Sequence, residues 1–590
     1  MVQTIDKMRE KAQVFKVSAQ DMPNAGLISK AFSLMTGFIQ GIANTYQLVT
    51  RFSGGTDPNA FHNFLMAQYD KLPADTLEVL LLPMFTPNIP VKKLYATLVN
   101  AIVKGIPLTK ALAELDIHLT QNVIAFGNPV ILDALRRIPR AENTSEQYYI
   151  DNPEVPRISG GRAFDSVLKA IGMGILSAPH DIHSLFTQQM IETLTIQSID
   201  TNKYQNNPFK QRFVNIVKDE TEQLLKQFRV QAQKKEFYTP DFLTYSLSIF
   251  LKGFYPPPDG VREEDNWPKE WVEKLAKKIE VVSDMAFKCI MDPYSDTEAL
   301  RSKAEEILGS DIDLIMERDQ FHYLDKKYFD QISAVLKKNH PDYSEDEINC
   351  EIRQIQRQII ISLIFAGGDN IKKFLDHCFV ELGRDEIKKK YIDSDYLNAP
   401  DPKVRRTNFD NLLKEIARHY TTIFAQPGKA LDDFVVTYKG QSFFVAKGTD
   451  LHYTTWQANL SSEWGPFAKE FNPEKNVGEH RDLNPLATFG GHERVCRGLT
   501  FTWAEAWYVI FKVLQEFSIT SQVNNKEDCH PTKFGFNNGL DGTPAYLFIP
   551  RAAKAEKRVA EDSFFGSRQK KPRTEGVLGD EAQHSFLSPA

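Results

Sequence analysis

The segment 346–382 constrains the fold most, because it is the longest uninterrupted helical pattern in the chain. It begins with charged residues and then becomes almost wholly apolar through Ile359-Ile-Ile-Ser-Leu-Ile-Phe365. A helix that is apolar on all sides belongs in the middle of a large core. The sequence therefore predicts one long buried helix.

The other elements follow from apolar spacing and turn signals, and they give a fold class that is mainly α with a minor β portion. Residues 1–115 are expected to form helices broken by turns, and residues 142–162 a loop. Asn128-Pro129 is expected to open a short helix over 130–135, with the proline near its first turn. The remaining expected elements are helices over 163–235, from 260 to 340, over 408–420 and over 498–517, and strands at 433–437 and 442–446.

Composition excludes several classes of protein. The 590 residues carry a net charge of −6, so there is no overall basic field to hold nucleic acid. Five scattered cysteines argue against a disulfide framework and for a reducing, cytoplasmic location. No apolar run reaches the roughly 20 residues that span a bilayer, so we expect a soluble protein, with peripheral membrane contact left open.

The strongest local signal is Thr488-Phe-Gly-Gly-His-Glu-Arg-Val-Cys-Arg-Gly498, which runs directly into a predicted helix. Its glycines predict a tight turn, and its cysteine, Cys496, lies just before the helix. A helix N-terminus and the flanking Arg494 and Arg497 would favour a thiolate, the form of cysteine that ligates metal. Cys496 is therefore suited to hold an iron through sulfur, and a buried cysteine in a glycine-rich turn is the alternative.

This run resembles the haem-binding loop of the cytochrome P-450 family, F-x-x-G-x-R-x-C-x-G. Phe489, Arg494, Cys496 and Gly498 stand at the matching spacings, whereas His492 replaces the second glycine of the pattern. The resemblance implies a cytochrome P-450-like fold with the long central helix over a haem b, and Cys496 as the ligand of its iron.

Two further landmarks lie upstream of Cys496 in the order that the family has. Glu415-Ile-Ala-Arg418 fits the family's E-x-x-R helix, and side chains at i and i+3 share a helix face, so they can pair and hold the loop behind the haem. Phe471-Asn-Pro-Glu-Lys475 resembles the segment that precedes the cysteine loop. Lys475 replaces the usual arginine there, so the third member of this clamp would be weaker.

The run Ala366-Gly-Gly-Asp-Asn370, inside the long helix, resembles the family's oxygen-activation motif, A-G-x-(D/E)-T. There, small residues let the helix bulge over the haem, and the resemblance implies that Gly367, Gly368, Asp369 and Asn370 line the oxygen site. Close helix packing is the alternative reading of the glycines. Asn370 stands in place of the threonine, and an amide can donate a hydrogen bond but cannot relay a proton as a hydroxyl does.

Residues that would contact the haem propionates come from the same resemblance. His183 follows a segment similar to the entry of the family's haem-contacting helix, but Thr187 stands where the family has an arginine. Lys429 stands near another basic position of the family, and Arg494 is the better-supported contact.

The resemblance implies an oxidoreductase, a monooxygenase that acts on a lipophilic small molecule and receives electrons from a separate ferredoxin or flavoprotein reductase. The substrate would enter beside Ile364, Phe365 and Ala366, and a basic face around the cysteine loop would dock the redox partner. Asn370 keeps a second class open, a peroxygenase or hydroperoxide isomerase acting on a fatty-acid-like substrate. A haem-binding scaffold or effector without turnover is the third.

Three regions are expected along the chain: a helical N-terminal segment over 1–115, the cytochrome P-450-like haem domain over 116–550, and a polar, flexible tail over 551–590. The tail carries the basic cluster Arg568-Gln-Lys-Lys-Pro-Arg573. A short solvated tail is the simplest interpretation, and a nuclear-import or export signal is the alternative.

Overall fold

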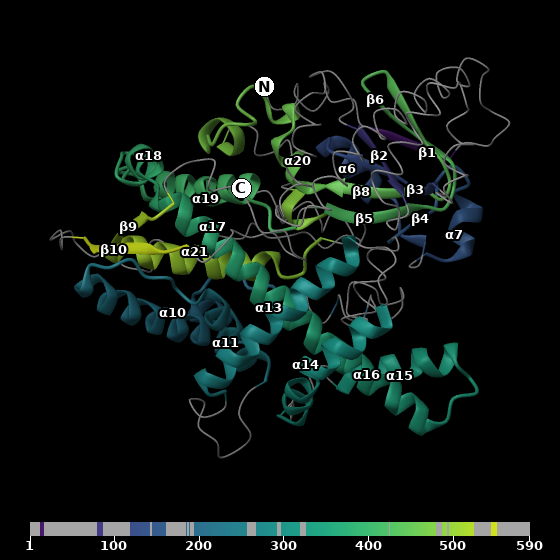
Figure 1. Ribbon diagram of the computed structural model, residues 1–590, viewed down its shortest axis with the longest axis horizontal. Coiled ribbons are helices and arrows are strands. Elements are labelled where there is room, and N and C mark those ends of the chain that lie inside the picture. The colour runs from purple at the N-terminus through teal and green to yellow at the C-terminus, as the bar shows by residue number, and fades with distance from the viewer. Residues whose placement is uncertain are drawn as a thin grey trace, which may run out of the picture. The chain divides into compact units, whose positions relative to one another are not determined.

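The computed structural model describes residues 12–16, 79–85, 119–141, 144–160, 185, 188, 194–255, 267–291, 297–318, 326–423, 425–478, 487–491, 495–523 and 544–551. The chain forms two compact units, Met1–Phe164 with Phe424–Gly465 and Asp165–Ile423 with Pro466–Ala590. The expected division at residues 115 and 551 borders residues outside these ranges and stays a prediction. Figure 1 labels the elements of both units.

The described part of the first unit is built on two sheets. One has the strand order β2-β3-β8-β5-β4 and the other β1-β6-β7, and within the first sheet β3 and β8 run parallel. The strands are β1 (Gln13–Lys16), β2 (Val79–Phe85), β3 (Leu119–Phe126), β4 (Ile158–Ser159), β5 (Ala425–Ala430), β6 (Phe434–Tyr438), β7 (Gln441–Val445) and β8 (Asp450–Thr454).

Strands β1 and β2 correct the expected helices at these two places, and almost all of the rest of 1–115 lies outside the described residues. β1 pairs with β6, so that Gln13 lies opposite Thr437, and β2 pairs with β3. A short strand is stabilised by its pairing with a remote partner, and local sequence spacing does not reveal that partner. The predicted strands at 433–437 and 442–446 are confirmed as β6 and β7.

Short helices complete the first unit: α6 (Pro129–Arg136), α7 (Glu146–Asp151) and α20 (Thr455–Leu460). The predicted start of α6 is confirmed, because the Asn128 side chain accepts hydrogen bonds from the backbone N–H groups of Val130 and Ile131. The predicted loop over 142–162 contains α7 instead. Ser145 caps this helix by accepting from the Tyr148 N–H, a signal that the polar composition concealed.

Helices dominate the described part of the second unit, which confirms the mainly α fold class. They are α10 (Pro208–Lys234), α11 (Phe242–Phe254), α13 (Lys269–Met291), α14 (Thr297–Arg318), α15 (Lys326–Asn339), α16 (Glu345–Ile364), α17 (Asn370–Gly383), α18 (Asp385–Ile387), α19 (Pro402–His419) and α21 (Leu499–Glu516). The strands β9 (Phe517–Ser521) and β10 (Tyr546–Pro550) pair antiparallel beside them.

The predicted long central helix is confirmed, with one interruption. It consists of α16, a π-helical turn η3 (Phe365–Asp369) and α17. Its apolar residues, among them Ile359, Leu363 and Phe379, are buried in the core of the unit. Helices α11, α14 and α15 pack against its first half and the turn, and α10, α17 and α21 lie together in Figure 1. Within the described ranges, no helix is both long and apolar enough to cross a bilayer.

A buried ion pair lies at the end of the central helix, and a hydrogen bond connects it to Tyr420, the residue that follows α19. Arg384 donates to both carboxylate oxygens of Glu381, at 2.9 and 2.8 Å, and the Tyr420 hydroxyl also donates to Glu381. Glu381 is fully buried and Arg384 is 3% exposed. Removing one partner would leave the other charge without compensation in a region of low polarity.

We predict that Arg384→Met destabilises the protein by about 3–5 kcal/mol, because it leaves the Glu381 carboxylate buried and unpaired. The measurement is the midpoint of denaturant unfolding. Lys303→Met is the control, because it removes an exposed pair with Glu306 and should change stability by less than about 1 kcal/mol. Equal midpoints for the two variants would contradict the assignment.

Candidate functional site

Cys496 lies in the second unit, at the end of a tight turn that leads into α21. The Cys496 N–H donates to the Phe489 carbonyl at 2.8 Å, which closes the turn. Gly490, inside it, has φ +73°, a left-handed conformation that favours glycine. The Cys496 side chain is accessible, as a metal ligand must be before it binds.

The surroundings of the Cys496 sulfur combine burial with hydrogen-bond donors. Many protein atoms lie around the accessible side chain, and their desolvating effect raises the pKa of its thiol. Hydrogen bonds from the Gly498 and Leu499 N–H groups and the charge of Arg497 act in the opposite direction. The predicted stabilisation of a thiolate by the helix start and Arg497 is thus present, but burial outweighs it in this state.

The turn is fixed to neighbouring helices on both sides. The Thr488 hydroxyl donates to the Ala417 carbonyl of α19 at 2.8 Å. On α21, the Trp503 indole N–H donates to the Asp410 carboxylate of α19 at 2.9 Å. The Phe489 ring, half-buried, meets the Trp503 ring edge to face, with 6.1 Å between centroids. The position of Cys496 therefore depends on α19.

Glu415 and Arg418 on α19 form the predicted ion pair, and both side chains are fully buried. Arg418 donates to both Glu415 oxygens at 2.8 Å, and also to the carbonyls of Ala468 and Glu470 at 2.6 and 3.2 Å. Because the arginine bonds the carboxylate and the preceding loop at once, it clamps that loop to α19.

Glu415 has further partners that the sequence did not indicate. The Asn472 N–H and the Asn476 side-chain amide each donate to its Oε1 at 2.8 Å, and His419 Nε2 lies 3.4 Å from the same oxygen. Burial opposes ionisation of Glu415, but the charge and hydrogen bonds of Arg418, with those of His419, outweigh it and hold its pKa well below the usual range.

The third side chain of the clamp is Asn476 and not Lys475, which corrects the expectation. Asn476 is fully buried on the π-helical turn η6 (Glu474–Gly478) and also donates to the carbonyls of Phe467 and Glu470. Lys475 is exposed, whereas Asn476 is buried against Glu415. A family pattern that puts a basic residue at this place does not show which neighbouring side chain points inward.

The π-helical turn lies where the resemblance predicted a bulge of the central helix. Its residue Ala366 is exposed, although Phe365 and Gly367 on either side are buried. A Cβ on Gly367 would overlap the Phe250 ring of α11, and one on Gly368 would lie 2.7 Å from Leu247 Cδ2. The glycines thus serve close helix packing, the alternative reading, and the accessible residue of the motif is Ala366.

The two predicted catalytic residues lie at the end of this turn. Asp369 is 2% exposed, and its Oδ2 lies 2.9 Å from Lys373 Nζ and 3.4 Å from the Ser283 hydroxyl of α13. Asn370, one residue on, has a buried Oδ1 that hydrogen-bonds to no described residue. A buried amide oxygen without a partner is rare, and it indicates a site for a bound group or water.

The predicted propionate contacts remain predictions. Lys429 is half-buried on β5, in the first unit. His183 and Arg494 lie outside the described residues, as does His492. Of the residues predicted to line the substrate cavity, Ile364 and Phe365 belong to the buried core. Their predicted place beside the substrate stays a prediction.

The residues present fit a haem. Cys496 supplies an accessible sulfur with two N–H donors, the arrangement of a ligating thiolate. Ala366 is accessible in the middle of a buried helix, and Asn370 carries an unpartnered oxygen on the same stretch. The turn that carries Cys496 and the helix stretch that carries Ala366 and Asn370 belong to the same unit, in which α17 packs against α21.

Comparisons with known proteins show which proteins this chain is similar to. No family model matches the chain. Cytochrome P450 monooxygenase milC of Cordyceps militaris is 26% identical over 206 residues, which are 32% of this chain and 38% of that protein. Cytochrome P450 52A5 of Candida maltosa is 27% identical over 195 residues, 30% of this chain and 37% of that protein.

A structural comparison aligns 73% of this chain with 90% of the retinoic acid bound cyanobacterial CYP120A1, at 14% identity and a TM-score of 0.48, an overlap too loose to support an argument. The chain spans 38% and 37% of the length of the two curated relatives. Over about a third of its length, the chain is therefore similar to cytochrome P450s.

Proposed function

We propose that this protein is a haem-thiolate monooxygenase that oxidises a lipophilic small molecule with dioxygen. The observation that carries the proposal is Cys496, an accessible thiol fixed at the start of α21 by a loop that is bonded to α19. The similarity to cytochrome P450 monooxygenases supports the same activity.

Haem b is the cofactor that this site would hold. Cys496 would ligate the iron, and Phe489 and Gly498 would lie beside the sulfur, because they flank it in the turn. Sulfur ligation of a haem pushes electron density toward bound oxygen and favours cleavage of the O–O bond. The protein would supply the pocket, the exclusion of water and the delivery of protons.

The π-helical turn would provide the opposite face of the site. Ala366 offers open space without a bulky side chain, and the Asn370 amide can hold a water or donate a hydrogen bond. The contacts of Asp369 with Lys373 and Ser283 fix its carboxylate near this site. We therefore assign hydrogen bonding to Asn370 and proton delivery to Asp369.

Electrons would come from a separate ferredoxin or flavoprotein. Lys469 and Lys475 are exposed on the segment that precedes the cysteine loop, and Arg497 is half-buried beside Cys496. Positive charge at this place would steer an acidic redox protein toward the sulfur side of the site, although the whole chain is negative.

Asn370 supports a second candidate, a peroxygenase or hydroperoxide isomerase acting on a fatty-acid-like substrate. The amide can orient a hydroperoxide by a hydrogen bond, whereas it lacks the hydroxyl that would relay protons to dioxygen. Supplying NADPH with a ferredoxin system to one sample and a lipid hydroperoxide to another separates the two. Product only in the first supports the monooxygenase, and product only in the second supports the alternative.

We predict that Cys496→Ala abolishes the red-shifted Soret band that thiolate-ligated haem shows after reduction in carbon monoxide, because it removes the sulfur ligand. Cys350→Ala is the matched control, since Cys350 is an exposed cysteine on α16. The control should keep the band. Identical spectra for the two variants would refute the assignment of the ligand.

We predict that Glu415→Gln lowers stability by about 3–5 kcal/mol and also releases haem, because it leaves the buried Arg418 charge unpaired and loosens the loop. Arg384→Met is the control, since it breaks a comparable pair away from the loop and should keep its haem. Retention of haem by Glu415→Gln at wild-type levels would contradict the role of the clamp.

The stability that the Glu415 carboxylate contributes depends on pH in a definite direction. The pKa of Glu415 is lower in the folded protein than the value of about 4.3 for an unfolded chain. The stabilisation is therefore fully present above that pH and is lost as the pH falls toward the folded pKa. The difference in unfolding midpoint between wild type and Glu415→Gln should narrow below about pH 4.

We predict that Asn370→Thr raises the ratio of product formed to oxygen consumed, because a hydroxyl can relay protons where an amide cannot. The ratio is measured with an oxygen electrode and product analysis in the reconstituted system. Asn370→Ala is the control and should lower the ratio or leave it low. A ratio that is the same in wild type and Asn370→Thr would argue against placing Asn370 at the oxygen site.

A further inference from the structure

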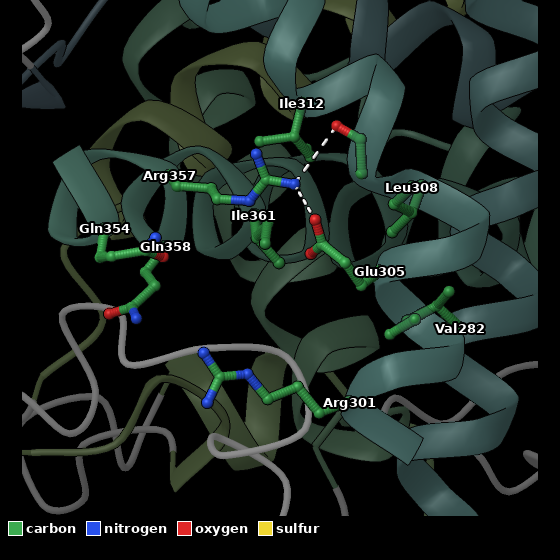
Figure 2. Close-up of a pocket in the computed structure, with 11 residues that line it drawn as sticks. Val282, Arg301, Glu305, Leu308, Ile312, Gln354, Arg357, Gln358 and Ile361 are labelled. Carbon is green, nitrogen blue, oxygen red and sulfur yellow. Dashed lines mark hydrogen bonds and ion pairs between the residues drawn. The ribbon is translucent and has the colours of Figure 1, made fainter. Parts of the chain in front are cut away.

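A pocket outside the candidate haem site opens between α13, α14 and α16 in the second unit (Figure 2). The enclosed space of the pocket is about 40 Å³, and the pocket opens to solvent. Ala366, Asn370 and Cys496 do not line it. Its walls are apolar where the helices meet, and the residues there are Val282, Leu308, Ile312 and Ile361.

On one polar wall of the pocket, the charged groups already have partners. Arg357 of α16 forms ion pairs with Glu305 and Asp313 of α14, and its guanidinium also donates to the Gly309 carbonyl at 3.3 Å. Figure 2 shows Arg357 and Glu305 bonded to each other on this wall. Two carboxylates share this one guanidinium, so the wall has a net negative charge and offers no positive charge to a ligand.

The other polar wall has groups without partners in the described part of the chain. The Arg301 side chain of α14 is exposed, extends along the pocket in Figure 2, and has no ion pair or hydrogen bond with any described residue. The Gln358 side chain of α16 has a buried Oε1 that likewise bonds to none of them. An unsatisfied buried amide is costly, so this wall lacks a polar group that a ligand could supply.

We propose that the pocket binds a small amphipathic carboxylic acid. Its carboxylate accepts hydrogen bonds from Arg301 and, after rotation of the amide, from Gln358. Its chain lies against Leu308, Ile312 and Ile361. A cation beside Arg301 would be repelled by its guanidinium, and a chain without a polar end would leave the buried Gln358 amide unsatisfied.

The pocket lies close to the π-helical turn. α16 leads from Gln358 and Ile361 into that turn within a few residues, and Val282 precedes Ser283, whose hydroxyl contacts Asp369. A ligand here contacts α13 and α16, the two helices that position Asp369, so its binding would act on that carboxylate.

The test uses the full chain as purified and sodium octanoate as the probe, with binding measured by isothermal titration calorimetry. 1-Octanol is the uncharged probe of equal length. We expect octanoate to bind more tightly than octanol. The substitution Arg301→Gln should lower the affinity for octanoate by about three- to tenfold and leave the affinity for octanol unchanged. Arg353→Gln, a change at an exposed arginine of α16 outside the pocket, should leave both affinities unchanged.

Gln358→Leu is a second, independent variant. It should lower the affinity for octanoate and raise the affinity for octanol. Absence of octanoate binding, equal affinity for the two probes, or unchanged octanoate affinity in Arg301→Gln would overturn the proposal. Octanoate binding that is lost when imidazole occupies the haem would also overturn it, since the ligand would then lie in the haem site. The carbon monoxide spectrum, which should be unchanged in Arg301→Gln, reports separately on the haem-thiolate assignment.

Discussion

The buried pair of Glu415 and Arg418 is the interaction on which the candidate site depends. Two charges taken out of water are costly, and they are tolerated only when every remaining hydrogen-bonding position is filled. Here the Asn472 N–H, the Asn476 amide and the carbonyls of Ala468 and Glu470 fill them. The geometry of the pair is therefore fixed, and the segment before the cysteine loop is fixed with it.

The sequence predicted those parts of the structure whose cause is local. The i, i+3 spacing of Glu415 and Arg418 places both side chains on one face of α19 wherever that helix lies. Asn128 caps α6 through hydrogen bonds that reach two and three residues along the chain. The apolar run of the central helix predicted its burial, because no surface tolerates a helix without a polar face.

Features that depend on remote partners were missed or misassigned. The N-terminal strand β1 exists because β6 pairs with it from the far side of the sequence. Asn476, rather than Lys475, reaches Glu415 because the π-helical turn η6 sets which side chain faces inward. A sequence motif records residue types and spacing, and a shift of one residue in backbone register changes the face that each side chain occupies.

In the central helix, the π-helical turn is a single backbone irregularity that divides the motif 366–370 among three surfaces. Gly367 and Gly368 face α11, because a Cβ at either position would meet Phe250 or Leu247. Asp369 contacts Ser283 on α13, and Ala366 is left accessible. The glycines allow the helix to approach α11 closely, and this approach leaves the accessible side of the turn to the small side chain of Ala366. Helix packing and the open space required by the proposed chemistry therefore have the same structural origin.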